Sequence, residues 1–271
     1  MSLSPSKFDN ILVMGKSGAG KQPRINVFIR EFGMEQLSTG NIFRSFMKAY
    51  NNSGYDGDLN QFFNTETNDF IADNEIKKII GSSVDNSNIE EIILGLKARY
   101  FVSGGHYVPD SLTNILFESA FAKAGYKGLV LDGYPRTVDQ AKFLLKLEEE
   151  KGVKLDAIIF VDNEDEVIIK RTMGRRICPS CAAVFHVDFK PPKDGRFCTK
   201  CGTEVVLRSD DTEEKLRTRL KEFQEKTAPT IKYLEKKGVT LVHAEGNLPV
   251  FTEEAVTESI LNCLRSAGLL K

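Results

Sequence analysis

Hydrophobic positions near the start of the chain change from a continuous run to a helical spacing. Residues 10–14 form a short apolar run of the length of a buried strand, and a glycine-rich segment follows at once. The next apolar side chains, at Ile25, Phe28, Ile29 and Phe32, have the spacing of one face of a helix. Gly33 follows as a stop signal. This pattern predicts a strand, a glycine loop and a helix over 23–32.

The same alternation returns along the chain. Apolar runs predict strands at 128–131, 157–161 and 239–242. Helical spacing predicts helices at 112–124, 138–151, 212–237 with a break near Pro229, and 252–264. Because short strands that alternate with helices form parallel sheets covered on both faces, we expect an α/β fold with four or five strands.

Two segments depart from this alternation. Residues 49–94 hold nine Asp or Glu, eight Asn and two Lys, which indicates an insertion. Its apolar residues suffice for one or two packed helices: Phe62, Phe63, Phe70, Ile71, Ile76, Ile79 and Ile80. Extra packing is one interpretation and binding of a partner or gating of a substrate is the other, and the acidic charge disfavours a polyanionic partner. Residues 178–206 are rich in Cys, Pro and Gly, as in a small metal-held module.

Composition adds few constraints. The chain has 271 residues, of which 41% are hydrophobic, and a formal net charge of −1. This is enough for one large domain or two modest ones, and the charge argues against a nucleic-acid binder. The first eight residues lack the apolar stretch of a signal peptide, and the sequence has no run of about 18 apolar residues to span a bilayer. We therefore expect a cytoplasmic protein without a membrane partner, whose five cysteines are metal ligands or buried thiols.

The segment Gly15-Lys-Ser-Gly-Ala-Gly-Lys21 fits a phosphate-binding loop. Its glycines let backbone N–H groups turn towards phosphate oxygens at a helix N-terminus, and Lys21 reaches the outer phosphates. A plain glycine turn before a helix is the alternative. Gln22 replaces the usual Ser or Thr after the lysine, and Pro23 has no N–H to donate.

Four cysteines, Cys178, Cys181, Cys198 and Cys201, form two C-x-x-C pairs with sixteen residues between them. This spacing is typical of a closed tetrahedral Zn²⁺ site with a structural role, while an iron–sulfur cluster and redox dithiols are the alternatives. Cys263 stands alone in the apolar pattern of the last predicted helix, where we expect a buried thiol.

Arginines are frequent near the cysteine pairs and the predicted strand ends: Arg44, Arg136, Arg171, Arg175, Arg176, Arg208, Arg217 and Arg219. A solvated surface is the ordinary interpretation, whereas converging guanidinium groups would bind phosphates. Asp132 and Arg136 come just after a predicted strand. Since parallel sheets bind ligands beyond the carboxyl ends of their strands, both residues are expected to face the same crevice as the glycine loop.

Several motifs together resemble the adenylate kinases. They are the glycine loop, Ser38-Thr-Gly40 with Arg44, Val108-Pro-Asp110, Asp132-Gly-Tyr-Pro-Arg-Thr137 with Gln140, Gly174-Arg-Arg176, Arg208-Ser-Asp-Asp211 and Thr227-Ala-Pro229. Their order and separations fit the family throughout, and only the acidic insertion falls outside the match. The cysteine pairs resemble the zinc-bearing lid of the long bacterial form.

The resemblance implies a P-loop NTPase-like fold, a parallel five-stranded sheet covered by helices. The core domain would comprise 1–37, 111–173 and 213–271, with a small helical NMP-binding domain at 38–110 and a zinc-ribbon-like β lid at 174–212. The implied protein is a monomer that transfers the terminal phosphoryl group of MgATP to AMP, giving two ADP, and carries structural Zn²⁺. In-line transfer of this kind is expected to rely on positioning and charge neutralisation.

The resemblance also implies the site residues. ATP would contact Gly18, Ala19, Gly20, Lys21, Gln22, Pro23, Arg171, Arg175, Val184, Phe185 and Leu248. AMP would contact Thr39, Arg44, His106, Tyr107, Val108, Gly133, Tyr134, Pro135, Arg136, Gln140, Arg208 and Arg219. The catalytic set would be Lys21, Asp132, Arg136, Arg171, Arg175, Arg208 and Arg219, with Asp132 ordering magnesium through its waters. The Gln140 amide offers a donor and an acceptor to an adenine edge, which favours AMP.

Three positions depart from the family pattern. Gln22-Pro23 replaces Gly-Thr, Asn41 replaces a common aspartate, and Leu248 replaces a lysine or similar residue. Loss of one amide that faces phosphate would slow the reaction on the order of ten- to hundredfold. Two other function classes therefore stay open: a nucleotide-binding homologue with weak or lost catalysis, and a zinc-ribbon nucleic-acid binder. The neutral charge and the lack of interleaved aromatic and basic residues disfavour the second.

Overall fold

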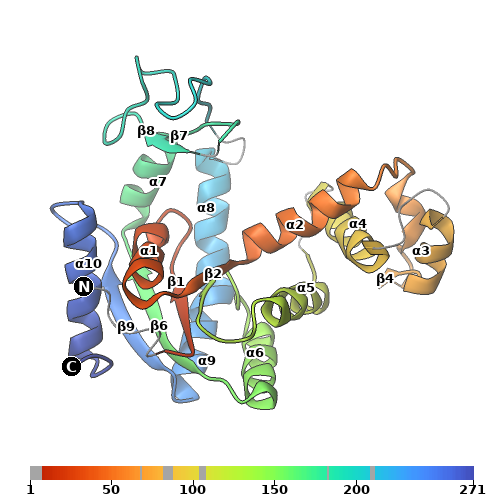
Figure 1. Ribbon diagram of the computed structural model, residues 1–271, viewed down its shortest axis with the longest axis horizontal. Coiled ribbons are helices and arrows are strands. Elements are labelled where there is room, and N and C mark those ends of the chain that lie inside the picture. The colour runs from red at the N-terminus through yellow and green to blue at the C-terminus, as the bar shows by residue number, and fades with distance from the viewer. Residues whose placement is uncertain (1–7, 68, 82–87, 104–107, 182, 208–210) are drawn as a thin grey trace.

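A five-stranded parallel sheet forms the centre of the molecule (Figure 1). The computed structural model describes residues 8–67, 69–81, 88–103, 108–181, 183–207 and 211–271. The strand order is β2-β5-β1-β6-β9. The strands are β1 (Asn10–Met14), β2 (Glu35–Ser38), β5 (Leu129–Asp132), β6 (Leu155–Asp162) and β9 (Thr240–Glu245). The predicted parallel α/β fold is confirmed.

Both faces of this sheet are buried, as the continuous apolar runs predict. Alternate residues of β1 belong to different clusters, Ile11 and Val13 to one and Leu12 and Met14 to the other. The first cluster lies under α1 (Lys21–Phe32), α7 (Asp165–Met173), α8 (Glu213–Glu222) and α10 (Glu253–Ser266). The second lies under α5 (Asp110–Lys123), α6 (Val138–Lys151) and α9 (Ala228–Lys236).

The predicted helices and strands of the core are present, with shifts of a few residues at their ends. α1 ends at Gly33, which has φ 65° and donates its N–H to Phe28 O, so the expected stop is confirmed. Residues 212–237 are helical with a break, as predicted, but the break is the π-helical segment η3 (Phe223–Thr227) between α8 and α9, and Pro229 lies in the first turn of α9. The sequence analysis missed α7 and the edge strand β2, whose Glu35 is exposed. Within the described ranges, no helix is long and apolar enough to cross a membrane.

An arm leaves the core after β2 (Figure 1). Its two long helices, α2 (Thr39–Asn52) and α4 (Ile89–Ser103), pack side by side. A Cβ atom at Gly95 would lie 2.1 Å from Phe46 O, so this close approach requires glycine. The far end of the arm holds η1 (Leu59–Phe62), β3 (Phe63–Asn64), β4 (Asp69–Phe70) and α3 (Asp73–Ile80).

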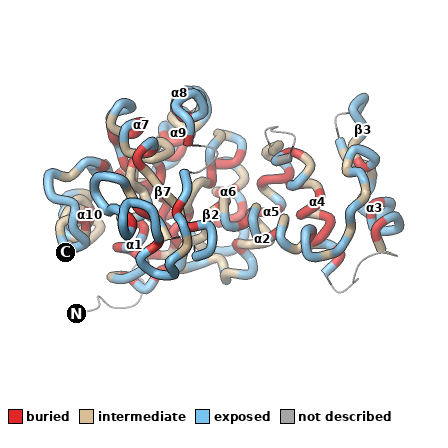
Figure 2. The backbone as a smooth tube through the Cα atoms, turned by 90° about the horizontal axis from the view of Figure 1, so that it is seen from above, coloured by how far each residue is buried: buried red, intermediate tan, exposed pale blue. Residues whose placement is uncertain are grey.

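The acidic insertion thus forms a small folded unit with a core of its own. Phe62, Ile76 and Ile80 are fully buried there together with Leu96 of α4. Figure 2 shows buried segments continuing into this end of the arm. Ile79 is the exception among the apolar residues expected to pack, since 42% of it is exposed.

A second small unit, which we call the lid, stands above the core and comprises residues 175–207 (Figure 1). Its described residues include the antiparallel pair β7 (Arg175–Ile177) with β8 (Val184–His186), and isolated β-bridges such as Ile177 with Val206 join the loops. Its core consists of Cys178, Phe185, Cys198 and Val205. Because so few apolar side chains are buried, this unit needs a cross-link of another kind.

Candidate active site

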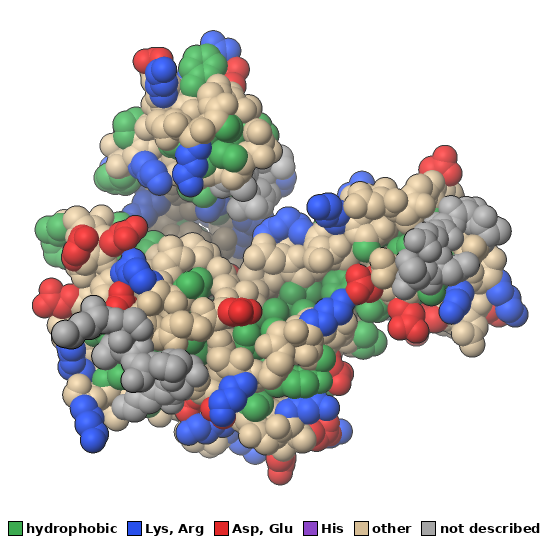
Figure 3. Space-filling view, viewed as in Figure 1, with side chains coloured by type: hydrophobic (Ala, Val, Ile, Leu, Met, Phe, Trp, Pro, Cys, Tyr) green, Lys and Arg blue, Asp and Glu red, His purple; other side chains and the backbone are tan. Residues whose placement is uncertain are grey.

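A cavity of about 660 Å³ lies at the carboxyl ends of the strands, between the core, the arm and the lid. Figure 3 shows the hollow beneath the lid, with basic side chains on its flanks. Fourteen of the predicted site residues line it: Gly18, Gly20, Lys21, Gln22, Pro23, Thr39, Arg44, Asp132, Gly133, Tyr134, Pro135, Arg136, Arg175 and Arg219. The topology therefore brings the glycine loop, the strand ends and a lid arginine to one place.

The glycine loop has the backbone conformation of a phosphate cradle. Gly18 has φ +88°, and a Cβ atom there would lie 2.6 Å from Thr172 Oγ1. Gly20 has φ +99° and is the N-cap of α1, so the loop opens directly onto a helix N-terminus. Backbone N–H groups and the helix dipole at such a position favour an anion.

Lys21 lies at the centre of this loop. Its Nζ donates to Gly15 O (2.9 Å) and Lys16 O (3.0 Å). The pKa of Lys21 is lowered to about 8, mainly by burial; Asp132 opposes this shift and Arg136 adds to it. A desolvated ammonium of this kind gains strongly from an anionic partner.

The residues after Lys21 show how the departures from the loop pattern are accommodated. Pro23 is the third residue of α1, where an N–H has no intrahelical acceptor, so the helix forms but the proline offers no donor to an anion. Arg24 is fully buried and donates to the carbonyl oxygens of Gly20 (3.1 Å) and Glu245. Burial first, and then the nearby Arg171, lowers the pKa of Arg24 to about 10. The sequence analysis missed Arg24, because a buried arginine bound to carbonyl groups has no sequence signature.

The side of the cavity next to the arm is organised around the turn after β5. Thr39 Oγ1 donates to Gly133 O (3.0 Å), and Arg136 Nε donates to the same oxygen (2.9 Å). A Cβ atom at Gly133 would lie 2.5 Å from Thr39 Oγ1, so this contact requires glycine. Arg44 donates to Asn41 Oδ1 and faces the cavity from α2.

Gln140 lies behind this turn and is only 2% exposed. Its Oε1 accepts from the Arg136 N–H (2.7 Å), and its Nε2 donates to Asp110 Oδ1 (2.8 Å). Asp110 Oδ2 also accepts from Thr137 Oγ1 (2.6 Å). Since a carboxylate only accepts and a backbone N–H only donates, these partners fix the orientation of the Gln140 amide.

Arg171 lies on the far side of the glycine loop. Its guanidinium donates to Gly246 O (3.0 Å) and Asn247 Oδ1 (2.9 Å), and it lies 5.5 Å from the centre of the Phe251 ring. Arg24 lies 5.2 Å from the same ring. Two cations thus flank an aromatic side chain that is 47% exposed, next to the loop that carries Leu248.

Several predicted residues are elsewhere. Seven lie outside the lining of the cavity: Ala19, Val108, Gln140, Arg171, Val184, Phe185 and Leu248. His106, Tyr107 and Arg208 lie outside the described residues. Arg176 donates to the carbonyl oxygens of Met173 and Arg175. Arg217 binds the exposed Glu213. Neither arginine lines the cavity.

The cavity also has lining residues that the sequence analysis missed. Gln36 comes from the overlooked strand β2, while Glu222 and Lys226 come from the end of α8 and from η3. A π-helical turn inside a helix often marks a functional site. The Thr227-Ala-Pro229 motif was the one sequence signal near this segment.

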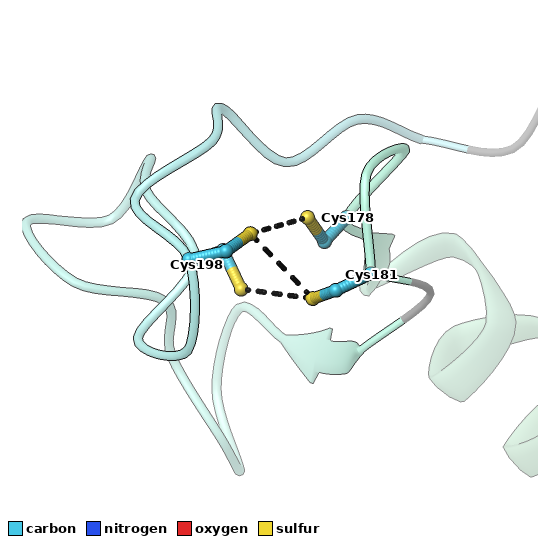
Figure 4. A group of neighbouring side chains, drawn as sticks. Cys178, Cys181 and Cys198 are labelled. Carbon is cyan, nitrogen blue, oxygen red and sulfur yellow. Dashed lines mark hydrogen bonds between the residues drawn. The ribbon is translucent and has the colours of Figure 1, made fainter.

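The four paired cysteines meet in the lid (Figure 4). Their sulfur atoms lie within 4.8 Å of one another, with Cys178 Sγ 3.4 Å from Cys201 Sγ and Cys181 Sγ 3.6 Å from Cys198 Sγ. A tetrahedron of thiolates with Zn–S bonds of about 2.3 Å has edges of about 3.8 Å, so the arrangement fits zinc. Hydrogen bonding with Thr203 lowers the pKa of Cys201 to about 6, whereas burial and contacts with the other three thiols raise the pKa of Cys181, so the shifts within the cluster oppose each other. Cys263 is partly buried against the core.

Comparison with known proteins places this geometry in a family. The adenylate kinase family model matches residues 87–239. An adenylate kinase of Symbiobacterium thermophilum is 33% identical over 259 residues, which cover 95% of this chain and 99% of that protein. One from Caldanaerobacter subterraneus is 35% identical over 238 residues, 88% of this chain and 89% of that protein, and one from Acholeplasma laidlawii is 32% identical over 94% and 97%. The strand-loop-helix, the cavity and these matches together show that the chain belongs to the adenylate kinase family.

Proposed function

We propose that the cavity transfers the terminal phosphoryl group of MgATP to AMP, reversibly, giving two ADP. Adenylate kinases are phosphotransferases, and the chain is one of them by family. The observation that carries the proposal is the cavity itself, in which the glycine loop with Lys21 faces Arg44 and Arg136 on the acceptor side. Such a pocket can hold two phosphate groups end to end.

The donor would bind along the glycine loop. Backbone N–H groups of the loop and the Lys21 ammonium would surround its phosphates, as in other P-loop proteins. Arg171 and the loop that carries Leu248 would contact its base, since both lie beyond the phosphate cradle next to Phe251. Val184 and Phe185 would approach from the lid.

The acceptor would bind between the arm and the turn after β5. Arg44 and Arg136 would bind its phosphate, and Thr39, Gly133, Tyr134 and Pro135 would form the pocket wall. Val108, His106 and Tyr107 would contribute from the segment between α4 and α5. Gln140 lies behind this pocket with its amide bound to the Arg136 N–H and to Asp110, so contact with an adenine edge would need its second N–H and its second lone pair, and this contact stays a prediction.

The chemical step would rest on positioning and charge neutralisation. Arg136, Arg175, Arg208 and Arg219 would neutralise the phosphoryl group as it moves between the two nucleotides. Closure of the lid over the cavity would exclude water, which would otherwise accept the phosphoryl group. The proposed domains are the core, an NMP-binding domain at 38–110 and a lid domain at 174–212.

Two metal ions belong to this proposal. Asp132 lines the cavity, and Mg²⁺ prefers oxygen atoms and keeps its waters, so this carboxylate fits the magnesium of MgATP. The four cysteines fit structural Zn²⁺, which would give the lid the rigidity that its small core does not supply. The monomeric state, the cytoplasmic location and the absence of nucleic-acid and membrane partners stay predictions.

A panel of nucleoside monophosphates tests the proposal. Each would be incubated with MgATP and formation of diphosphate followed, with parallel samples lacking magnesium. AMP should be the best acceptor, and the reaction should require Mg²⁺. If ATP binds but none of the monophosphates is phosphorylated, the chain is a nucleotide-binding homologue that has lost catalysis.

A further inference from the structure

The residue after the loop lysine is Gln22, where phosphate loops usually carry a hydroxyl group. Its side chain lines the cavity together with two other polar residues, Gln36 of β2 and Asp132 at the end of β5. The first turn of α1 and two neighbouring strands thus each contribute one side chain to the same wall. The transfer mechanism described above gives a role only to Asp132.

Hydrogen bonds join these three side chains in a chain. Gln36 Nε2 donates to Asp132 Oδ2 (3.1 Å) and to Gln22 Oε1 (3.2 Å). Gln22 Nε2 donates to Gln36 Oε1 (3.0 Å) and to Asn26 Oδ1 (3.0 Å). The two glutamines therefore form a reciprocal amide pair, and Asp132 lies at one end of it.

The chemistry of the groups fixes the direction of every one of these bonds. An ionised carboxylate only accepts, so Gln36 must present its NH₂ group to Asp132. The reciprocal pairing then orients the Gln22 amide as well. Each NH₂ group has two N–H bonds, and all four are used within this chain of residues.

Only acceptor capacity is therefore left over for a ligand. Among the described contacts, each amide oxygen uses one of its two acceptor positions, and Asp132 Oδ1 adds another. Water molecules that coordinate Mg²⁺ are strong donors and need acceptors of this kind. An amide pair that faced the cavity with its N–H groups would repel such a water shell.

We propose that Gln22 and Gln36 are positioning residues that hold Asp132 and accept hydrogen bonds from the water shell of the magnesium ion in MgATP. This inference rests on the proposed function. The adenylate kinase pattern has Gly-Thr at positions 22 and 23, so the Gln22 amide takes over part of what the neighbouring hydroxyl group would do. The neutral amide of Gln36 also satisfies Asp132 without an ion pair, so that the carboxylate and the nearby Lys21 ammonium both stay available to the substrate.

Binding of a non-hydrolysable ATP analogue, measured by calorimetry with Mg²⁺ and again with EDTA, tests this role. The ratio of the two affinities reports what the metal ion contributes, independently of turnover. In Gln36→Leu and in Gln22→Leu this ratio should fall roughly two- to tenfold, the effect of one lost hydrogen bond, and in Gln36→Leu binding in EDTA should change less than about twofold. Asn26→Ala is the matched control, since Asn26 accepts from the same Gln22 amide but does not line the cavity, and it should keep the wild-type ratio.

Two results would overturn the inference: a wild-type ratio in both leucine variants, whether or not the overall affinity falls, or no gain from magnesium in the wild-type protein. Thermal midpoints show whether each variant is folded. If one of the two leucine variants does not fold, the other still gives the ratio. The result is separate from the proposed transfer. If the ratio falls as expected but no ADP forms in the acceptor assay, the metal role stands and the proposed transfer fails.

Discussion

Arg175 and Asp211 form a bidentate ion pair across the base of the lid. Arg175 Nε lies 2.8 Å from Asp211 Oδ2, and Arg175 Nη2 lies 2.6 Å from Asp211 Oδ1. Asp211 is fully buried, whereas Arg175 is partly exposed and lines the cavity. The pair links β7 to the segment just before α8, so a carboxylate behind the cavity sets where this guanidinium points.

Replacement of Asp211 by Asn should therefore reduce both stability and activity. The amide keeps the shape but loses the charge and one acceptor, so we expect a loss of roughly 1–3 kcal/mol in unfolding free energy and at least about a tenfold loss in kcat. Arg217→Ala, at an exposed arginine paired with Glu213, should change neither. Denaturant unfolding and ADP formation measure the two effects, and unchanged kcat in Asp211→Asn would show that Arg175 does not act in the cavity.

The cysteine site should matter for stability more than for turnover. Cys198→Ser and Cys201→Ser each remove one of the four sulfur atoms that meet in the lid, and the apolar core there is too small to hold it. We expect wild-type protein to contain one zinc ion per chain by elemental analysis, and the variants to lose it. The thermal midpoint should then drop far more than turnover at moderate temperature. Equal losses of both would contradict a purely structural role, and iron in place of zinc would contradict the metal assignment.

Binding of the donor should depend on pH through Lys21. Its pKa of about 8 lies below the ordinary 10.5, so the ammonium is charged below pH 8 and loses its proton as pH rises through this value. Affinity for an ATP analogue should thus be highest below pH 8 and fall above it, by up to about tenfold per pH unit. Arginine keeps its charge, so Lys21→Arg should remove this fall even where its affinity is lower overall. Affinity is measured for wild type and Lys21→Arg over pH 6.5–9.5, roughly one unit or more on either side of the transition. If affinity falls equally steeply with pH in both proteins, Lys21 is not the titrating group.

Glu148 should make the protein less stable as pH rises. It is buried in α6, and burial raises its pKa from 4.5 to about 8, although Asn10 Nδ2 donates to it (3.5 Å). The folded state therefore holds this proton more tightly than the unfolded state, and stability present below pH 4.5 is lost as pH rises towards 8.

Glu148→Gln removes this proton uptake and should be the more stable protein at neutral pH. The advantage over wild type should be small near pH 4.5 and reach on the order of 2–3 kcal/mol at pH 7. Denaturant unfolding at several pH values measures it. Glu149→Gln, at the exposed neighbour, should follow the wild-type curve. A constant difference between Glu148→Gln and wild type at all pH values would contradict the buried, protonated state.

Much of the core could be predicted from sequence because its signals are local. β1, β5 and β6 are continuous apolar runs buried on both faces, and the glycine loop needs residues that tolerate positive φ. The strand β2 was missed, since Glu-Gln-Leu-Ser has one apolar side chain and forms the edge of the sheet. Gln36 was missed with it.

The parts that could not be predicted depend on contacts between distant segments. Arg24 has partners at Gly20 and at Glu245, which is 221 residues away, and no spacing rule connects them. The Gln22 substitution was recognised as a departure, but its link to Asp132 runs through Gln36 of another element. Substitutions in a motif are therefore best interpreted together with the residues that fold beside them.

The central claim is that two nucleotides meet in one cavity and exchange a phosphoryl group. The most direct test uses ATP labelled at its terminal phosphorus, incubated with this protein and Mg²⁺ with or without AMP. The account predicts label in ADP only when AMP is present, with little label in inorganic phosphate. Label that remains in ATP although the nucleotide is bound, or that passes to inorganic phosphate regardless of AMP, would contradict it.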